Sequence, residues 1–180
     1  MHDQFAWALD SSNLLEIIMA NDAKQHFLDI LTDFDTAMLV SHASDRSLHA
    51  RPMAIADLDS GGDLWFVTSS SSGKVDEILD DAEVAVTMQS SSRFLSLSGK
   101  ASLHRDRELI AKLWKEPWKV WFPKGEDDPD IVLLKVTADD GEYWDNSGFS
   151  GLKYLFAAGK AYLKGERPEV DLQVNQRVSL

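Results

Sequence analysis

The sequence predicts a mainly β (α+β) fold, built as an antiparallel barrel or sandwich with a few peripheral helices. Short strand-like runs follow one another along most of the chain, and only a few helix-like stretches separate them. This order argues against a doubly wound parallel sheet, in which strands and helices alternate. The chain has 180 residues, 44% of them apolar, which suffices for one substantial core but is short for two. We therefore expect residues 1–180 to form a single domain.

The first predicted element is a helix over residues 23–34, and two shorter helices follow later in the chain. In all three segments apolar side chains recur at the three- and four-residue spacing of one helix face. They are Ala23, Phe27, Ile30, Leu31 and Phe34 in the first segment, Val75, Ile78 and Leu79 in the second, and Leu109, Ile110, Leu113 and Trp114 in the third. The second helix should begin at about Gly73, and Asp106 is placed to cap the third.

Six runs have the composition of β-strands. They span residues 36–41, 49–58, 63–69, 84–90, 94–103 and 131–138. The fifth is the clearest, because apolar or small residues alternate in it with serine and lysine, as a strand with one buried face requires. Gly61 and Gly62 lie between the second and third runs and predict a hairpin there. Residues 146–180 are more polar, and we interpret them as an extension with weak strand character beyond a core of about 23–145.

The charge balance limits the partners that the protein is expected to have. A formal net charge of −12 and an isoelectric point near 4.7 argue against nucleic acid and against an anionic membrane. The absence of cysteine excludes disulfides and thiol chemistry and is typical of a reducing compartment. No basic leader and no run of eighteen apolar residues occur, and the five histidines lack the spacing of a metal motif. We expect a cytoplasmic protein without a metal site.

Residues 67–74 read VTSSSSGK and join the third predicted strand to the second helix. A Walker phosphate loop requires a glycine at position 68 and a hydroxyl residue at position 75, where this chain has Thr68 and Val75. Hydroxyls and backbone N–H groups nevertheless converge where the strand ends and the positive end of the helix dipole begins. The segment is therefore either an ordinary capped connection or a cradle for phosphate, with Lys74 supplying a positive charge.

Arg51 favours the phosphate interpretation. By the two-residue period of a strand it shares a face with Met53 and Ile55, where a half-buried guanidinium needs an anionic partner. Pro52 cannot donate to a strand ladder, so this strand is expected to be an edge or to be interrupted there. The predicted hairpin brings Arg51 close to the level of residues 68 and 69. A phosphate fits that point better than any side chain visible in the sequence.

Five segments carry a resemblance to a known family. They are ARPMAI, LWFVTSSSSGKVDEI, LSLSGKASLHRD, LWKEPWKVWFPKGEDDPDIVLLKV and EYWD, and together they span about Asp35 to Asp145. In these segments the chain resembles the flavin-binding split barrels related to pyridoxamine 5′-phosphate oxidase, within them the general stress protein 26 branch. The resemblance implies a six-stranded antiparallel split β-barrel that forms a homodimer, with FMN, or alternatively FAD, bound at the dimer interface.

The resemblance also implies which residues hold the flavin. Carried over by position, a basic and hydroxyl group would bind the phosphate, the backbone around Met53 and Ala54 would face the ring, and Gln89 would reach it across the interface. The complete set of candidate flavin-binding residues is Arg51, Pro52, Met53, Ala54, Val67, Thr68, Ser69, Ser72, Lys74, Gln89, Trp121 and Trp144. The C-terminal arginine and histidine that recognise substrate in true oxidases of the family have no counterpart in the ending LQVNQRVSL.

Two other groups of residues remain open to more than one interpretation. An aromatic cluster either stacks on a planar ring or packs in the core and the dimer interface; its members are Trp114, Trp118, Trp121, Phe122 and Trp144. The carboxylates of residues 125–130, GEDDPD, lack the pattern of a calcium loop and are interpreted as a solvated turn.

No side chain stands out as a nucleophile or a tuned general base, so any catalysis is expected to belong to the flavin. The first hypothesis is an FMN-binding general stress protein that acts as a flavin-dependent oxidoreductase. The alternatives are a non-catalytic flavin-binding or flavin-buffering protein, and a split-barrel module that binds another planar anion such as haem.

Overall fold

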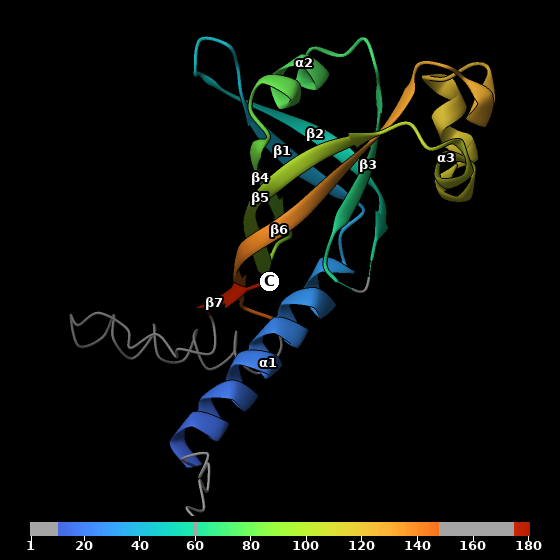
Figure 1. Cartoon of the computed structure of the whole chain (residues 1–180). Helices are drawn as coiled ribbons and strands as arrows, with labels where there is room; N and C mark the ends of the chain where they lie inside the picture. Colours follow the sequence, from blue (N-terminus) through green and yellow to red (C-terminus); the bar gives the residue numbers. More distant parts are fainter. Residues whose placement is uncertain (1–10, 60, 148–174) are drawn as a thin grey trace, which may run out of the picture.

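The computed structural model describes residues 11–59, 61–147 and 175–180, and its centre is a closed six-stranded antiparallel barrel (Figure 1). The strands are β1 (Thr36–His42), β2 (Leu48–Leu58), β3 (Leu64–Ser69), β4 (Glu83–Gln89), β5 (Arg93–His104) and β6 (Ile131–Asp145), with β7 (Asn175–Ser179) beside them. Neighbouring strands follow the order β3-β2-β1-β4-β5-β6, and pairing of β3 with β6 closes the ring. Strand β7 pairs with β6 outside the barrel. The mainly β split-barrel prediction is therefore confirmed.

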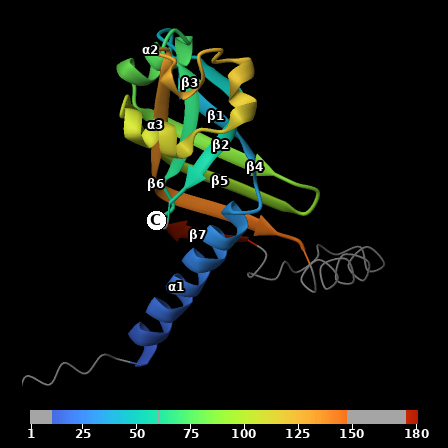
Figure 2. The same ribbon diagram turned by 90° about the vertical axis from the view of Figure 1, so that its right-hand side faces the viewer.

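Helices occupy the two ends of the barrel. They are α1 (Ser11–Leu31), α2 (Gly73–Asp80) and α3 (Arg107–Leu113), followed by the short 3₁₀ helices η1 (Glu116–Val120) and η2 (Gly125–Asp127). Figures 1 and 2 show α1 at one end and both α2 and α3 at the other. Among the described residues, no helix combines the length and the apolar character that crossing a membrane would require.

The core has two parts. Inside the barrel, fully buried side chains such as Phe66 and Leu134 meet Phe27 and Ile30 of α1, which closes one end. A second apolar cluster lies under α3 and η1, and its buried members are Ala56, Ile110, Leu113, Trp118, Phe122, Ile131 and Leu133. Since β6 supplies residues to both clusters, η1 is anchored directly to the barrel wall.

Most element boundaries agree with the sequence prediction. Five of the six predicted strands begin and end within one residue of their expected positions. Helix α2 begins at Gly73, and the Asp106 carboxylate caps α3 by accepting hydrogen bonds from the N–H groups of Glu108 and Leu109. Gly62 takes a φ of 95° in the hairpin turn, a conformation that only glycine adopts without strain. Of the predicted C-terminal extension, residues 148–174 lie outside the described residues, and the end forms β7.

Three predicted boundaries were wrong. Helix α1 ends at Leu31, three residues before the predicted end, and residues 32–34 continue it only as a turn. Helix α1 begins twelve residues before the predicted start. The prediction missed its first half because the apolar side chains there, such as Leu14 and Ile17, are exposed and form no buried stripe. Strand β6 continues to Asp145 through Asp139, Asp140 and Gly141, which read as a turn in the sequence. A β-bulge accommodates them: Ser98 of β5 pairs with Asp140, whereas the next residue, Gly99, pairs with Ala138.

Candidate functional site

The barrel is split between β2 and β3. The two strands pair only from Ile55 to Leu58 of β2, and residues 48–54 pair with β1 alone. On the other side, residues 67–69 of β3 pair with β6 alone. The opening holds a cavity of about 480 Å³, a size typical of small-molecule sites. We call it the split pocket; it is lined by Pro52, Met53, Ala54, Val67, Thr68, Ser69, Ser72, Lys74, Trp118, Trp121, Phe122 and Asp130.

Lys74 is the cation of the split pocket. Its ammonium group donates hydrogen bonds to Thr68 Oγ1 at 2.8 Å and to Ser72 Oγ at 2.7 Å. Burial lowers the pKa of Lys74, and the positive charge of Arg51 lowers it further, while Glu77 opposes the shift. Among the described residues, no carboxylate lies within ion-pair distance of this ammonium. A partly desolvated cation is thus held by neutral hydroxyls at the start of α2.

Arg51 has a carboxylate partner of its own. Its guanidinium donates to Glu77 Oε2 at 2.6 Å and to Ser41 Oγ at 3.0 Å, and Glu77 also contacts His49 at 2.7 Å. Burial would raise the pKa of Glu77, but hydrogen bonds from Ser41, His49 and Arg51 outweigh it and lower the pKa to about 2. Sequence reasoning missed this carboxylate partner of Arg51, and the role of Arg51 in holding a flavin phosphate stays a prediction. Arg51 is not among the residues that line the split pocket, but it lies near enough for its charge to lower the pKa of Lys74.

Asp130 anchors the loop that joins β3 to α2. Its two carboxylate oxygens accept hydrogen bonds from the hydroxyls of Ser69 and Ser70, and its carbonyl accepts from the Ser70 N–H at 2.7 Å. Because β3 and β6 are paired up to Ser69 and Ile131, Asp130 stands directly opposite the start of this loop. The described part of the pocket lining therefore contains one cation and one anion, Lys74 and Asp130.

An aromatic wall formed by η1 and the residues after it closes another side of the split pocket. Trp118 and Phe122 are buried, whereas Trp121 is 69% exposed although it lines the cavity. Lys115 holds this wall against β2, because its ammonium donates to the carbonyl of Ile55 at 3.2 Å and lies 5.7 Å from the ring centre of Trp118. The pocket thus presents a flat apolar surface near one exposed indole.

The structure brings nine of the twelve candidate residues together in one pocket lining, which does not include Arg51. Gln89 and Trp144 lie elsewhere: both are paired with Phe94, at the end of β5 that faces away from the split. Neither residue lines the split pocket of its own chain, so their proposed role across a dimer interface stays a prediction.

Sequence reasoning missed Asp130 as a site residue and left Trp118 and Phe122 undecided. Asp130 belongs to the GEDDPD segment, which was interpreted as a solvated turn, and its position directly before a buried strand was the available signal. Three of the five members of the aromatic cluster line the pocket, and whether they stack on a planar ring stays a prediction.

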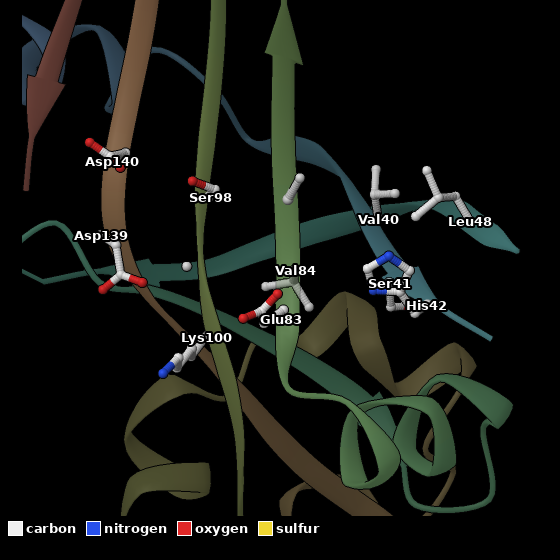
Figure 3. A pocket seen from close by; sticks show the side chains of 12 residues that line it. Val40, Ser41, His42, Leu48, Glu83, Val84, Ser98, Lys100, Asp139 and Asp140 are labelled. Atoms are coloured by element: carbon white, nitrogen blue, oxygen red, sulfur yellow. The ribbon is translucent and has the colours of Figure 1, made fainter. Parts of the chain in front are cut away.

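A second groove, of about 380 Å³, crosses the outer face of the barrel (Figure 3). Val40 and Leu48 border it on one side, and Asp139 and Asp140 of β6 border it on the other. Within the described ranges, no group of three or more side chains is arranged to hold a metal ion, here or elsewhere. The groove offers a mixed apolar and charged surface.

Comparison with known proteins gives consistent matches. The family described as pyridoxamine 5′-phosphate oxidase like matches residues 22–169. General stress protein 26 of Bacillus subtilis is 27% identical over 124 residues, which cover 66% of this chain and 86% of that protein. Protein bli-3 of Neurospora crassa is 33% identical over 107 residues, or 53% of this chain, and the match spans only about half (51%) of its length.

Among solved structures, the general stress FMN/FAD binding protein of Xanthomonas citri superposes with a TM-score of 0.61 and 29% identity. The match covers 71% of this chain and 92% of that one.

Proposed function

Because the chain belongs to the pyridoxamine 5′-phosphate oxidase-like family, we propose that it is an FMN-binding protein whose phosphate site lies at Lys74, Thr68 and Ser72. The Xanthomonas citri relative, whose name describes it as binding FMN or FAD, supports a flavin as the ligand. The likeness to general stress protein 26 supports assignment to that branch.

The observation that carries this proposal is the state of Lys74. Burying half of an ammonium group that contacts only hydroxyls costs desolvation free energy, and an anion placed beside it would offset that cost. The N-terminus of the eight-residue helix α2 lies at the same place and adds backbone N–H groups with a favourable dipole. The donor set therefore fits a phosphate.

The rest of the split pocket fits a planar ring. Residues 52–54 have no β3 partner, so backbone hydrogen-bonding groups of β2 face the opening. Trp121 offers an exposed indole face for stacking. A bound flavin would supply electron or hydride transfer, while the protein binds the phosphate, orients the ring and shields it from water.

Flavin titration tests the proposal. We expect the fluorescence of FMN to be quenched when it binds to the protein. FMN should bind at least tenfold more tightly than riboflavin, because riboflavin leaves Lys74 without an anion. Equal affinities would contradict the phosphate assignment, and binding of neither flavin would contradict the proposed function. Mixing the FMN complex with NADH or NADPH in a stopped-flow instrument then separates an oxidoreductase, whose flavin is reduced, from a flavin-buffering protein, whose flavin is not.

We further propose that the protein is a homodimer and that the second copy completes the flavin site. The outer face of the barrel exposes the large apolar side chains of Met38, Leu48 and Phe94. Met38 is paired with Pro52, which lines the split pocket, so this face and the pocket share a border. A partner seated there would bring its own Gln89 and Trp144 within reach of the ring.

Sedimentation velocity at micromolar concentration is expected to show two chains. Met38→Glu would place a charge in the contact and should yield a monomer with weakened FMN binding. Met19→Glu is the matched control, since Met19 is 61% exposed on α1, at the end of the barrel away from α2, and this variant should stay dimeric. A wild-type monomer that binds FMN with full affinity would contradict the shared site.

A further inference from the structure

The hydroxyl protons in the serine loop can be assigned one by one. Ser69 and Ser70 each have a single hydroxyl proton, and each donates it to Asp130. Ser71 Oγ lies 2.7 Å from Ser69 Oγ, and because the Ser69 proton is already used, Ser71 is the donor in that pair. The protons of these three serines are therefore committed within the loop and do not point at a ligand.

The opposite assignment holds for Thr68 and Ser72. Both hydroxyls accept a hydrogen bond from Lys74, so each keeps its own proton, for which the described residues provide no acceptor. One N–H of the Lys74 ammonium also remains. The donors available to a ligand anion are thus concentrated at one end of the pocket, around a single positive charge.

Asp130 makes the neighbouring part of the pocket unfavourable for anions. Hydrogen bonds from Ser69 and Ser70 lower the pKa of its carboxyl group and outweigh the effect of burial, so that the group is ionised at neutral pH. An ionised carboxylate has no proton to donate, and a second negative group beside it is repelled. Lys74 can balance the charge of one phosphate, and the described lining contains no second cation to balance another.

We propose that Asp130 is a specificity-determining residue that limits the split pocket to one phosphate group. It does so by drawing the Ser69 and Ser70 protons away from the ligand and by repelling a second phosphate. The site then prefers a flavin monophosphate to a flavin dinucleotide, whose pyrophosphate carries two adjacent charges. This inference rests on the proposed flavin-binding function.

The test compares wild type with Asp130→Asn by titration with FMN, FAD, inorganic phosphate and pyrophosphate. The asparagine amide removes the charge and donates to one serine, which turns that hydroxyl proton toward the pocket. We expect FAD and pyrophosphate to bind at least fivefold more tightly to the variant, so that the preference for the monophosphate falls. Asp127→Asn, which removes an exposed carboxylate of η2 outside the pocket, is the matched control and should keep the wild-type preference.

The change in the affinity ratio shows whether Asp130 selects between ligands or only holds the loop in place. A variant in which the loop is merely loosened binds all four ligands more weakly and with an unchanged ratio, and that result overturns the inference. An unchanged ratio with unchanged affinities overturns it as well. If wild type binds neither flavin, the proposed function fails, and the ratio of pyrophosphate to phosphate affinities still decides the role of Asp130. If none of the four ligands binds, the inference fails too.

Discussion

Replacing Lys74 by methionine is expected to weaken FMN binding by a factor of roughly 30 to 5,000, corresponding to 2 to 5 kcal/mol for a charge pair shielded from solvent. Methionine keeps much of the length of the side chain but removes the ammonium that holds Thr68 and Ser72. Riboflavin affinity should change little, since riboflavin has no phosphate to lose. Isothermal titration calorimetry with both flavins measures the two effects separately.

A control variant and the contrary outcome make this test decisive. Lys112→Met removes an exposed lysine in the last turn of α3, away from the pocket lining, and should bind FMN as the wild type does. If Lys74→Met binds FMN at wild-type affinity, then Lys74 does not hold the phosphate. Arg51, which is paired with Glu77, would then be the remaining cation to examine.

Replacing Gly99 by alanine is expected to lower the free energy of unfolding by about 3 kcal/mol. At Gly99 a Cβ atom would lie 2.1 Å from the carbonyl oxygen of Thr137, so the β-bulge between β5 and β6 must shift to admit it. The loss is measured by urea denaturation of the ligand-free protein. Gly73→Ala is the matched control, because a Cβ there would meet no atom within 4 Å, and it should unfold at the wild-type urea concentration or above. Equal midpoints for the two variants would refute the steric argument.

The strands could be predicted from the sequence because each carries its signal locally. Alternation of buried and exposed residues, as in β5, needs no knowledge of the partner strand. The end of β6 could not be predicted in this way. Asp139, Asp140 and Gly141 have the composition of a turn, and only the bulge opposite Ser98 and Gly99 keeps them in the strand.

The site was predictable where one continuous segment forms it, and not where distant segments meet. Thr68, Ser72 and Lys74 lie within one strand-to-helix connection, and their convergence follows from its local geometry. The partners of Arg51 and of the serine loop were missed for the opposite reason. Glu77 and Asp130 come from other elements, and nothing in the local pattern of α2 or of the GEDDPD segment shows what they face.

Closure of the barrel between β3 and β6 has a consequence for the order in which the protein folds. The two strands are far apart in the sequence, and pairs such as Thr68 with Val132 form only when a long loop has been closed. The contact of Asp130 with Ser69 depends on the same closure, so we expect the pocket to be assembled late in folding. A ligand of this pocket therefore stabilises only the completed barrel, and saturating it raises the melting temperature without accelerating the early steps of folding.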